Sequence, residues 1–330
     1  MRIKRTTGTS CLKHRYSRNG RTASVCGDGL LPQTADLLSA IHGSCAPDAW
    51  RDQIIHGDCL SELRRMPCEM IDLVVTSPPY ADSRKGTYGG MHPDQYVDWF
   101  LPITAELKRV LKPHGTFILN IKEKVVESER HIYVMELILG MRRQGWLWTE
   151  EFIWHKKNCY PGKWPNRFRD AWERCLQFNK QKKFHMYQES VMVPMGEWAK
   201  TRLKNLSETD KRRDDSRVKS GFGKRIANWL GRERAYPTNV LHFSTECSNR
   251  NHSAVFPIAL PRWFIRLFTR ECDLVLDPFL GSGTTAIAAQ ALNRHYVGIE
   301  IQSEYVRLAK GALKVISNGQ NHSPADSAVR

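Results

Sequence analysis

The sequence of 330 residues lacks long apolar runs and closely spaced cysteine pairs. Its apolar runs, such as residues 73–75 and 117–119, are far shorter than the roughly 18 residues that indicate a membrane-spanning helix, so we expect none. The basic residues near the N-terminus have no apolar segment behind them, so we expect no secretory signal. None of the nine cysteines lies in C-x-x-C spacing, which argues against a zinc ribbon, and we predict no metal site. A scattered, odd set of cysteines is typical of a reduced, cytoplasmic protein.

Acidic residues are the scarcer charge: 34 stand against 50 basic residues, for a net charge of +16. Residues 155–235 alone hold 21 basic and 9 acidic residues, a net charge of +12. The same segment is rich in aromatic side chains. Because basic residues neutralise phosphates and aromatic faces stack on bases, this composition favours contact with nucleic acid. A small subdomain with an aromatic core and a solvated basic surface is the alternative.

Apolar spacing elsewhere predicts short, fully buried strands that alternate with amphipathic helices, which is typical of a parallel sheet covered by helices. The predicted strands are residues 53–56, 71–76, 116–121, 147–154, 176–178, 273–276 and 295–301. The predicted helices are residues 59–66, 93–111, 131–143, 257–269, 286–292 and 303–315. Residues 200–235 are predicted to be loop or surface helix.

A glycine-rich turn follows the strand at 273–276. Gly281-Ser282-Gly283 directly precedes a helix, and this is the turn that nucleotide-containing cofactors use in doubly wound folds. Asp277 ends that strand and Glu300 ends the next, where a carboxylate can accept both ribose hydroxyls. No lysine follows Gly283, which disfavours a phosphate-binding P-loop.

A second motif, Thr76-Ser77-Pro78-Pro79-Tyr80, ends a buried strand. Its prolines fix the backbone and remove two amide donors, so its carbonyl groups are free to accept hydrogen bonds. Ser77 adds a hydroxyl and Tyr80 a flat face for stacking. Such a turn suits the exocyclic amino group of a nucleobase.

Together, Asp277-Pro278-Phe279-Leu280-Gly281-Ser282-Gly283 and Thr76-Ser77-Pro78-Pro79-Tyr80 resemble the motifs of the S-adenosylmethionine-dependent DNA amino-methyltransferases. The order of the motifs is similar to the β-type arrangement of that family, and the resemblance spans roughly residues 51–315. It implies an α/β fold with a Rossmann-like, doubly wound class I methyltransferase sheet, a circularly permuted motif order and an inserted basic target-recognition region.

The resemblance also implies a division of the chain and a set of site residues. Residues 1–50 would be a partly flexible extension, 51–154 the catalytic half, 155–235 the DNA-binding target-recognition region, 236–315 the cofactor-binding half and 316–330 a polar tail. The implied catalytic residues are Ser77, Pro78, Pro79 and Tyr80. The implied residues that bind S-adenosyl-L-methionine are Asp58, Thr76, Asp277, Pro278, Phe279, Gly281, Ser282, Gly283, Thr284 and Glu300.

A serine before Pro-Pro-Tyr is typical of the N4-cytosine enzymes, whereas Asp or Asn is more typical of the N6-adenine enzymes. We therefore expect N4-cytosine methylation, with N6-adenine methylation as the alternative. The target base would flip out of the duplex and stack on Tyr80. Ser77 and the Pro78 carbonyl would hold its amino group for direct in-line attack on the methyl group. A non-catalytic DNA-binding module on the same fold is an alternative of another class, against which the intact motifs argue.

Double-stranded DNA is the predicted partner. The predicted DNA contacts are Arg84, Lys85, Lys156, Lys157, Arg167 and Arg169. Whether a cognate restriction endonuclease accompanies the enzyme stays open, as does the choice between monomer and homodimer.

Overall fold

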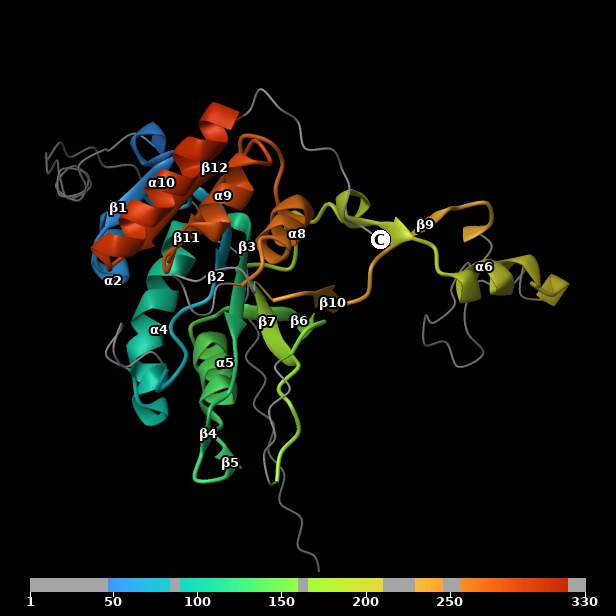
Figure 1. The fold of residues 1–330 in the computed structure, drawn as a ribbon, viewed down its shortest axis with the longest axis horizontal. Helices are drawn as coiled ribbons and strands as arrows, with labels where there is room; N and C mark the ends of the chain where they lie inside the picture. Colours follow the sequence, from blue (N-terminus) through green and yellow to red (C-terminus); the bar gives the residue numbers. More distant parts are fainter. Residues whose placement is uncertain (1–46, 84–89, 160–165, 210–228, 246–255, 320–330) are drawn as a thin grey trace, which may run out of the picture. The chain divides into compact units, whose positions relative to one another are not determined.

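The computed structural model describes residues 47–83, 90–159, 166–209, 229–245 and 256–319. Within these ranges, eight strands form one sheet in the order β1-β12-β11-β2-β3-β7-β6-β10 (Figure 1). Of these eight strands, β7 alone runs antiparallel to its neighbours. The strands are β1 (Gln53–His56), β2 (Ile71–Thr76), β3 (Leu111–Ile121), β6 (Leu147–Lys156), β7 (Trp172–Asn179), β10 (Val240–Phe243), β11 (Leu274–Asp277) and β12 (His295–Glu300).

Helices cover both faces of this sheet, because the buried strands carry apolar side chains on both sides. One face packs on α2 (Cys59–Arg65), α4 (Pro93–Val110) and α5 (Tyr133–Arg143). The other packs on α8 (Ala259–Phe268), α9 (Thr284–Gln290) and α10 (Ser303–Gly319). No helix in the described ranges is long and apolar enough to cross a membrane.

The remaining elements are short. They are η1 (Pro47–Trp50), β4 (Val125–Val126), β5 (Glu129–Arg130), η2 (Gln188–Val191), β8 (Val193–Pro194), α6 (Glu197–Lys204) and β9 (Arg234–Ala235). β4 pairs with β5 and β8 with β9, each pair antiparallel.

The predicted α/β fold class is confirmed, and several details differ. Strand β3 begins at Leu111 rather than at residue 116, and the residues after Leu111 bulge out before pairing with β2 resumes at Thr116. Helix α10 continues to Gly319, past the predicted end at 315. The ribbon β4–β5 and the edge strand β10 were not predicted, because runs of two to four residues carry too little periodicity.

The basic segment 155–235 is not wholly outside the sheet. Strand β7 occupies residues 172–179 and lies between β3 and β6. That the rest of the segment binds the target stays a prediction, and part of it lies outside the described residues.

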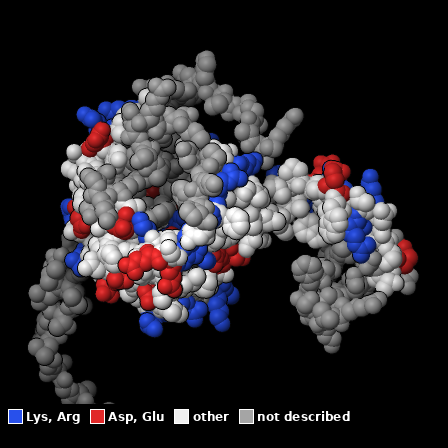
Figure 2. Space-filling model, turned by 60° about the horizontal axis from the view of Figure 1, so that its bottom comes forward, with Lys and Arg blue, Asp and Glu red and all other residues white. Residues whose placement is uncertain are grey.

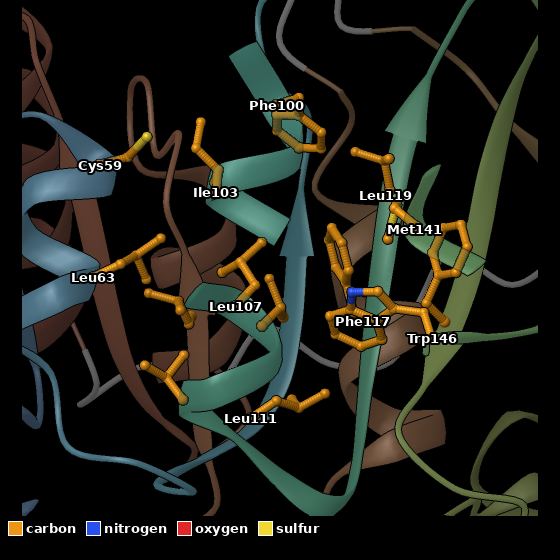
Figure 3. Close-up of a cluster of buried hydrophobic side chains, with 14 of the residues drawn as sticks. Cys59, Leu63, Phe100, Ile103, Leu107, Leu111, Phe117, Leu119, Met141 and Trp146 are labelled. Carbon is orange, nitrogen blue, oxygen red and sulfur yellow. The ribbon is translucent and has the colours of Figure 1, made fainter. Parts of the chain in front are cut away.

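Aliphatic and aromatic side chains together fill the core between α4, α5 and the sheet (Figure 3). Trp146 is 1% exposed, and its ring centroid lies 5.6 Å from Phe117 and 6.2 Å from Phe178. Its indole Nε1 is buried and has no hydrogen-bond partner among the described residues. The packing of this side chain, rather than its polar atom, therefore supports the core.

We predict that Trp146→Ala lowers the free energy of unfolding by about 3–5 kcal/mol, since truncation leaves a large cavity between rigid strands and helices. Trp148, two residues further on, is 40% exposed and supplies a matched control. Urea denaturation measures both variants, and an equal loss for Trp148→Ala would contradict the assignment of Trp146 to the core.

Candidate catalytic and cofactor site

The two motifs meet at the centre of the sheet. Strands β11 and β2 are parallel neighbours, and the helices that follow them, α9 and α4, cover opposite faces. Ligands of open α/β sheets bind in the crevice at the carboxyl ends of two such strands. Asp277 ends β11 and Thr76 ends β2, and the Thr76 hydroxyl donates a 2.6 Å hydrogen bond to Asp277 Oδ1.

Asp277 is buried at the carboxyl edge of the sheet, with 1% of the residue exposed, and forms several hydrogen bonds there. Besides Thr76, its carboxylate accepts hydrogen bonds from the Phe279 amide at 3.0 Å and the Thr285 hydroxyl at 2.6 Å. Burial raises the pKa of Asp277 to about 6, although these three donors oppose the shift and nearby Glu300 adds to it. The carboxylate thus links the end of β2, the loop after β11 and the first turn of helix α9.

The glycine loop is held by Glu300. Glu300 Oε2 accepts the Gly281 amide at 2.8 Å, and Oε1 accepts the Gln302 amide at 2.8 Å. Gly283 caps α9 with φ +98°, where a side chain would be strained and its Cβ would lie 2.9 Å from Ala309 Cβ. Glu300 therefore links the end of β12 to the start of the glycine loop.

The other predicted cofactor residues lie along the same edge. Pro278 is buried, Ser282 and Thr284 are half-buried, and the Phe279 ring packs 5.9 Å from Trp99. Asp58 is the N-cap of α2, where its Oδ1 accepts both the amide and the hydroxyl of Ser61 at 2.9 Å. Asp58 follows β1, the neighbour of β12, so it also lies at the carboxyl edge of the sheet.

The Ser-Pro-Pro-Tyr turn is anchored by its tyrosine. The Tyr80 hydroxyl lies 2.7 Å from Glu173 Oε2, 3.1 Å from Asn120 Oδ1 and 3.3 Å from Ser77 Oγ. Burial and the adjacent Glu173 carboxylate raise the pKa of Tyr80 well above its usual value of 10, so the phenol stays protonated. Pro78 is buried, whereas Ser77 and Pro79 are half-buried.

Sequence reasoning missed Asn120 and Glu173. Asn120 lies near the end of β3, a strand predicted to be buried, so a polar residue there was a usable signal. Glu173 had no such signal, because only the antiparallel course of β7 brings its first residues to the carboxyl edge of the parallel strands.

The predicted DNA contacts differ in their exposure and in their bonding partners. Lys156 forms a 2.6 Å ion pair with Glu173, and its side chain is only 16% exposed. Lys157 and Arg169 are exposed, and Arg167 donates a hydrogen bond to the Ser128 carbonyl. Arg84 and Lys85 lie outside the described residues.

An open cleft of about 700 Å³ lies beside Tyr80. Five basic and two acidic residues line it, an excess that suits a polyanion. The charged lining residues are Lys122, Lys124, Arg130, Arg167, Arg169, Glu123 and Asp170. Figure 2, which brings the side of β4 and β5 forward, shows Lys and Arg side chains interspersed with Asp and Glu side chains. Lys122, Lys124 and Arg130 were not predicted, because residues 51–154, in which they lie, carry a net negative charge, with 13 basic and 15 acidic residues.

The raised pKa of Asp277 has a measurable consequence. Because the folded-state pKa exceeds that of an unfolded aspartate, the folded protein binds more protons between pH 3.8 and about 6. The contribution of Asp277 to the free energy of unfolding therefore falls as pH rises through this window. We predict that Asp277→Asn, which cannot titrate, removes this decline. Urea denaturation at a series of pH values compares the two proteins, and identical pH dependence would contradict the assignment.

Known proteins are similar to this chain in sequence and in fold. A family described as DNA methylase matches residues 71–311. Type II methyltransferase M.PvuII of Proteus hauseri is 32% identical over 286 residues, which cover 79% of this chain and 83% of the relative. DNA adenine methyltransferase YhdJ of Escherichia coli (strain K12) is 28% identical over 285 residues, which cover 83% of this chain and 87% of the relative.

Solved structures agree on the fold. The structure of PvuII DNA methyltransferase (cytosine-N4-specific) is 28% identical and matches with a TM-score of 0.58, over 78% of this chain and 84% of that one. Thermus thermophilus TTHA0409, in complex with S-adenosyl-L-methionine, is 22% identical and matches with a TM-score of 0.53, over 81% of this chain and 95% of that one. The family that the two motifs indicated is therefore confirmed, and this chain belongs to the DNA methylase family.

Proposed function

We propose that this chain is a site-specific DNA methyltransferase that transfers the methyl group of S-adenosyl-L-methionine to the exocyclic N4 amino group of cytosine in duplex DNA. The observation that carries the proposal is the Thr76–Asp277 hydrogen bond. It brings the Ser-Pro-Pro-Tyr turn and the cofactor loop to neighbouring strand ends, where an amino nitrogen and a sulfonium methyl group can meet.

The chemistry requires positioning more than acid or base strength. The amino nitrogen bonds the methyl carbon as the carbon–sulfur bond breaks, the sulfonium leaves as a neutral thioether, and the methylated nitrogen releases one proton to solvent. Because the sulfonium is a good leaving group, the main requirement is that the amino nitrogen is aligned with the methyl carbon. Ser77 Oγ and the Pro78 carbonyl accept hydrogen bonds from the amino group, and the Tyr80 ring stacks on a base flipped out of the duplex. No covalent bond between enzyme and base is involved.

The carboxyl edge of β11, β12 and β1 would hold S-adenosyl-L-methionine, which supplies the methyl group. The Gly281–Gly283 loop would lie against it, Glu300 would accept hydrogen bonds from the ribose hydroxyls, and Asp58 would lie near the adenine. The cleft beside Tyr80 binds the DNA backbone through its excess of basic residues. A cognate restriction endonuclease is an expected companion, because several relatives are type II methyltransferases.

Three observations bear on the choice of base. Ser77 before Pro-Pro-Tyr and the similarity to a cytosine-N4-specific enzyme favour cytosine. The similarity to an adenine methyltransferase makes N6-adenine the second candidate.

The direct test is to incubate the protein with labelled S-adenosyl-L-methionine and unmethylated genomic DNA, digest the DNA and identify the methylated nucleoside by mass. We expect N4-methylcytosine. N6-methyladenine would overturn the choice of base and keep the reaction class, whereas absence of any methylated nucleoside would contradict the proposed function.

Ser77→Ala is expected to slow methyl transfer about 10- to 100-fold, since one hydrogen bond to the reacting group is worth about 1.5–3 kcal/mol. The dissociation constant of the cofactor should not change. Ser190→Ala, which removes an exposed hydroxyl bonded only to backbone carbonyls, is the control. An unchanged rate for Ser77→Ala would remove Ser77 from the catalytic residues.

Gly298→Ala tests the support of the cofactor loop. A Cβ at Gly298 would lie 2.3 Å from Leu280 Cδ2, so the buried side chain of Leu280, the residue before Gly281, would have to move. We expect about tenfold weaker cofactor binding, or 1.4 kcal/mol, by calorimetric titration. Gly311→Ala, whose Cβ would meet no atom within 4 Å among those described, should bind normally.

A further inference from the structure

The Tyr80 hydroxyl lies in a buried polar cluster that the proposed reaction does not explain. Asn120 is 3% exposed and Glu173 is 8% exposed, although both carry polar side chains. They come from β3 and β7, strands whose backbones pair antiparallel, with Asn120 opposite Cys175. Lys156, at the end of β6, completes the cluster. Burial of polar side chains is unfavourable unless they form hydrogen bonds, and Asn120, Glu173 and Lys156 each form at least one here.

Three donors converge on the Glu173 carboxylate. Oε1 accepts from Lys156 Nζ at 2.6 Å, and Oε2 accepts from the Tyr80 hydroxyl at 2.7 Å and from Asn120 Nδ2 at 3.2 Å. Asn120 Nδ2 also donates to the Arg174 carbonyl at 3.1 Å, which fixes the amide plane. The carboxylate therefore acts only as an acceptor in this cluster.

This arrangement fixes the direction of the hydrogen bonds. The Tyr80 hydroxyl has one hydrogen, and it goes to Glu173, the shorter contact and the charged acceptor, rather than to Asn120 at 3.1 Å. The Tyr80 oxygen is then left as an acceptor for the Ser77 hydroxyl hydrogen at 3.3 Å. Consequently the lone pairs of Ser77 Oγ point away from Tyr80 and can accept a hydrogen from an amino group.

We propose that Glu173 is a positioning residue for methyl transfer, acting through Tyr80 to orient the Ser77 hydroxyl as an acceptor, with Lys156 holding Glu173 in place. The inference rests on the proposed function. Without Glu173, the Tyr80 and Ser77 hydroxyls could rotate, and Ser77 could present its hydrogen to the amino group instead of a lone pair. That rotation would misplace the amino nitrogen without weakening cofactor binding.

The test is a double-mutant cycle on single-turnover methyl transfer, with Tyr80→Phe, Glu173→Gln and the two combined. Tyr80→Phe keeps the stacking ring and removes the hydroxyl through which Glu173 acts. We expect Glu173→Gln to slow transfer about tenfold, the effect of one charge-assisted hydrogen bond, with an unchanged dissociation constant for S-adenosyl-L-methionine. The double variant should be no slower than Tyr80→Phe alone.

Glu151→Gln supplies the matched control, because Glu151 also pairs with a basic residue, Arg174, but has no contact with Tyr80 among the interactions described. Its rate should stay within about twofold of the unmodified protein. If Glu173→Gln does not fold, as judged by thermal denaturation, Lys156→Gln probes the same cluster: it should slow transfer in the unmodified background and have no effect in the Tyr80→Phe background.

Additive losses in the double variant, or a loss of cofactor affinity equal to the loss of rate, would overturn the proposal and leave Glu173 a structural residue. These outcomes are distinct from failure of the proposed function, in which the unmodified protein itself would methylate no DNA.

Discussion

The hydrogen bond between Thr76 and Asp277 joins residues 201 positions apart in the chain, and the site depends on it. Asp277 is buried at the end of β11, and its carboxylate also bonds the Phe279 amide and the Thr285 hydroxyl. One acidic group thus fixes the end of β2, the loop after β11 and the start of α9 relative to one another. Burial of that charge is unfavourable, as its raised pKa of about 6 reflects.

The sheet explains why these groups meet where they do. Helices α4 and α9 leave the neighbouring strands β2 and β11 toward opposite faces, which opens a crevice at the strand ends. The strands are held rigid by an apolar core on each face of the sheet. One core includes the cluster shown in Figure 3, and the other packs against α8, α9 and α10. The polar residues at the strand ends are therefore held within hydrogen-bonding distance of one another.

Antiparallel β7 adds a third contribution to the same edge. Its first residues lie beside the ends of β3 and β6, which brings Glu173 to Tyr80 and to Lys156. Lys156, one of the predicted DNA contacts, is thereby paired with the Glu173 carboxylate inside the protein. Conversely, Lys122, Lys124 and Arg130 line the cleft beside Tyr80, although residues 51–154, in which they lie, carry a net negative charge.

The sequence by itself determined the fold class, because buried strands and short turns depend on residues that are neighbours in the chain. Its two motifs indicated the family through their resemblance to known enzymes. The same motifs and strand ends predicted Asp277, Glu300 and the Ser77–Tyr80 turn as site residues. Only the tertiary structure decided which groups meet: Thr76 with Asp277, Glu300 with Gly281, and Tyr80 with Asn120 and Glu173. These contacts depend on strand order and on the direction of β7, and the periodicity of a single segment carries no information about either.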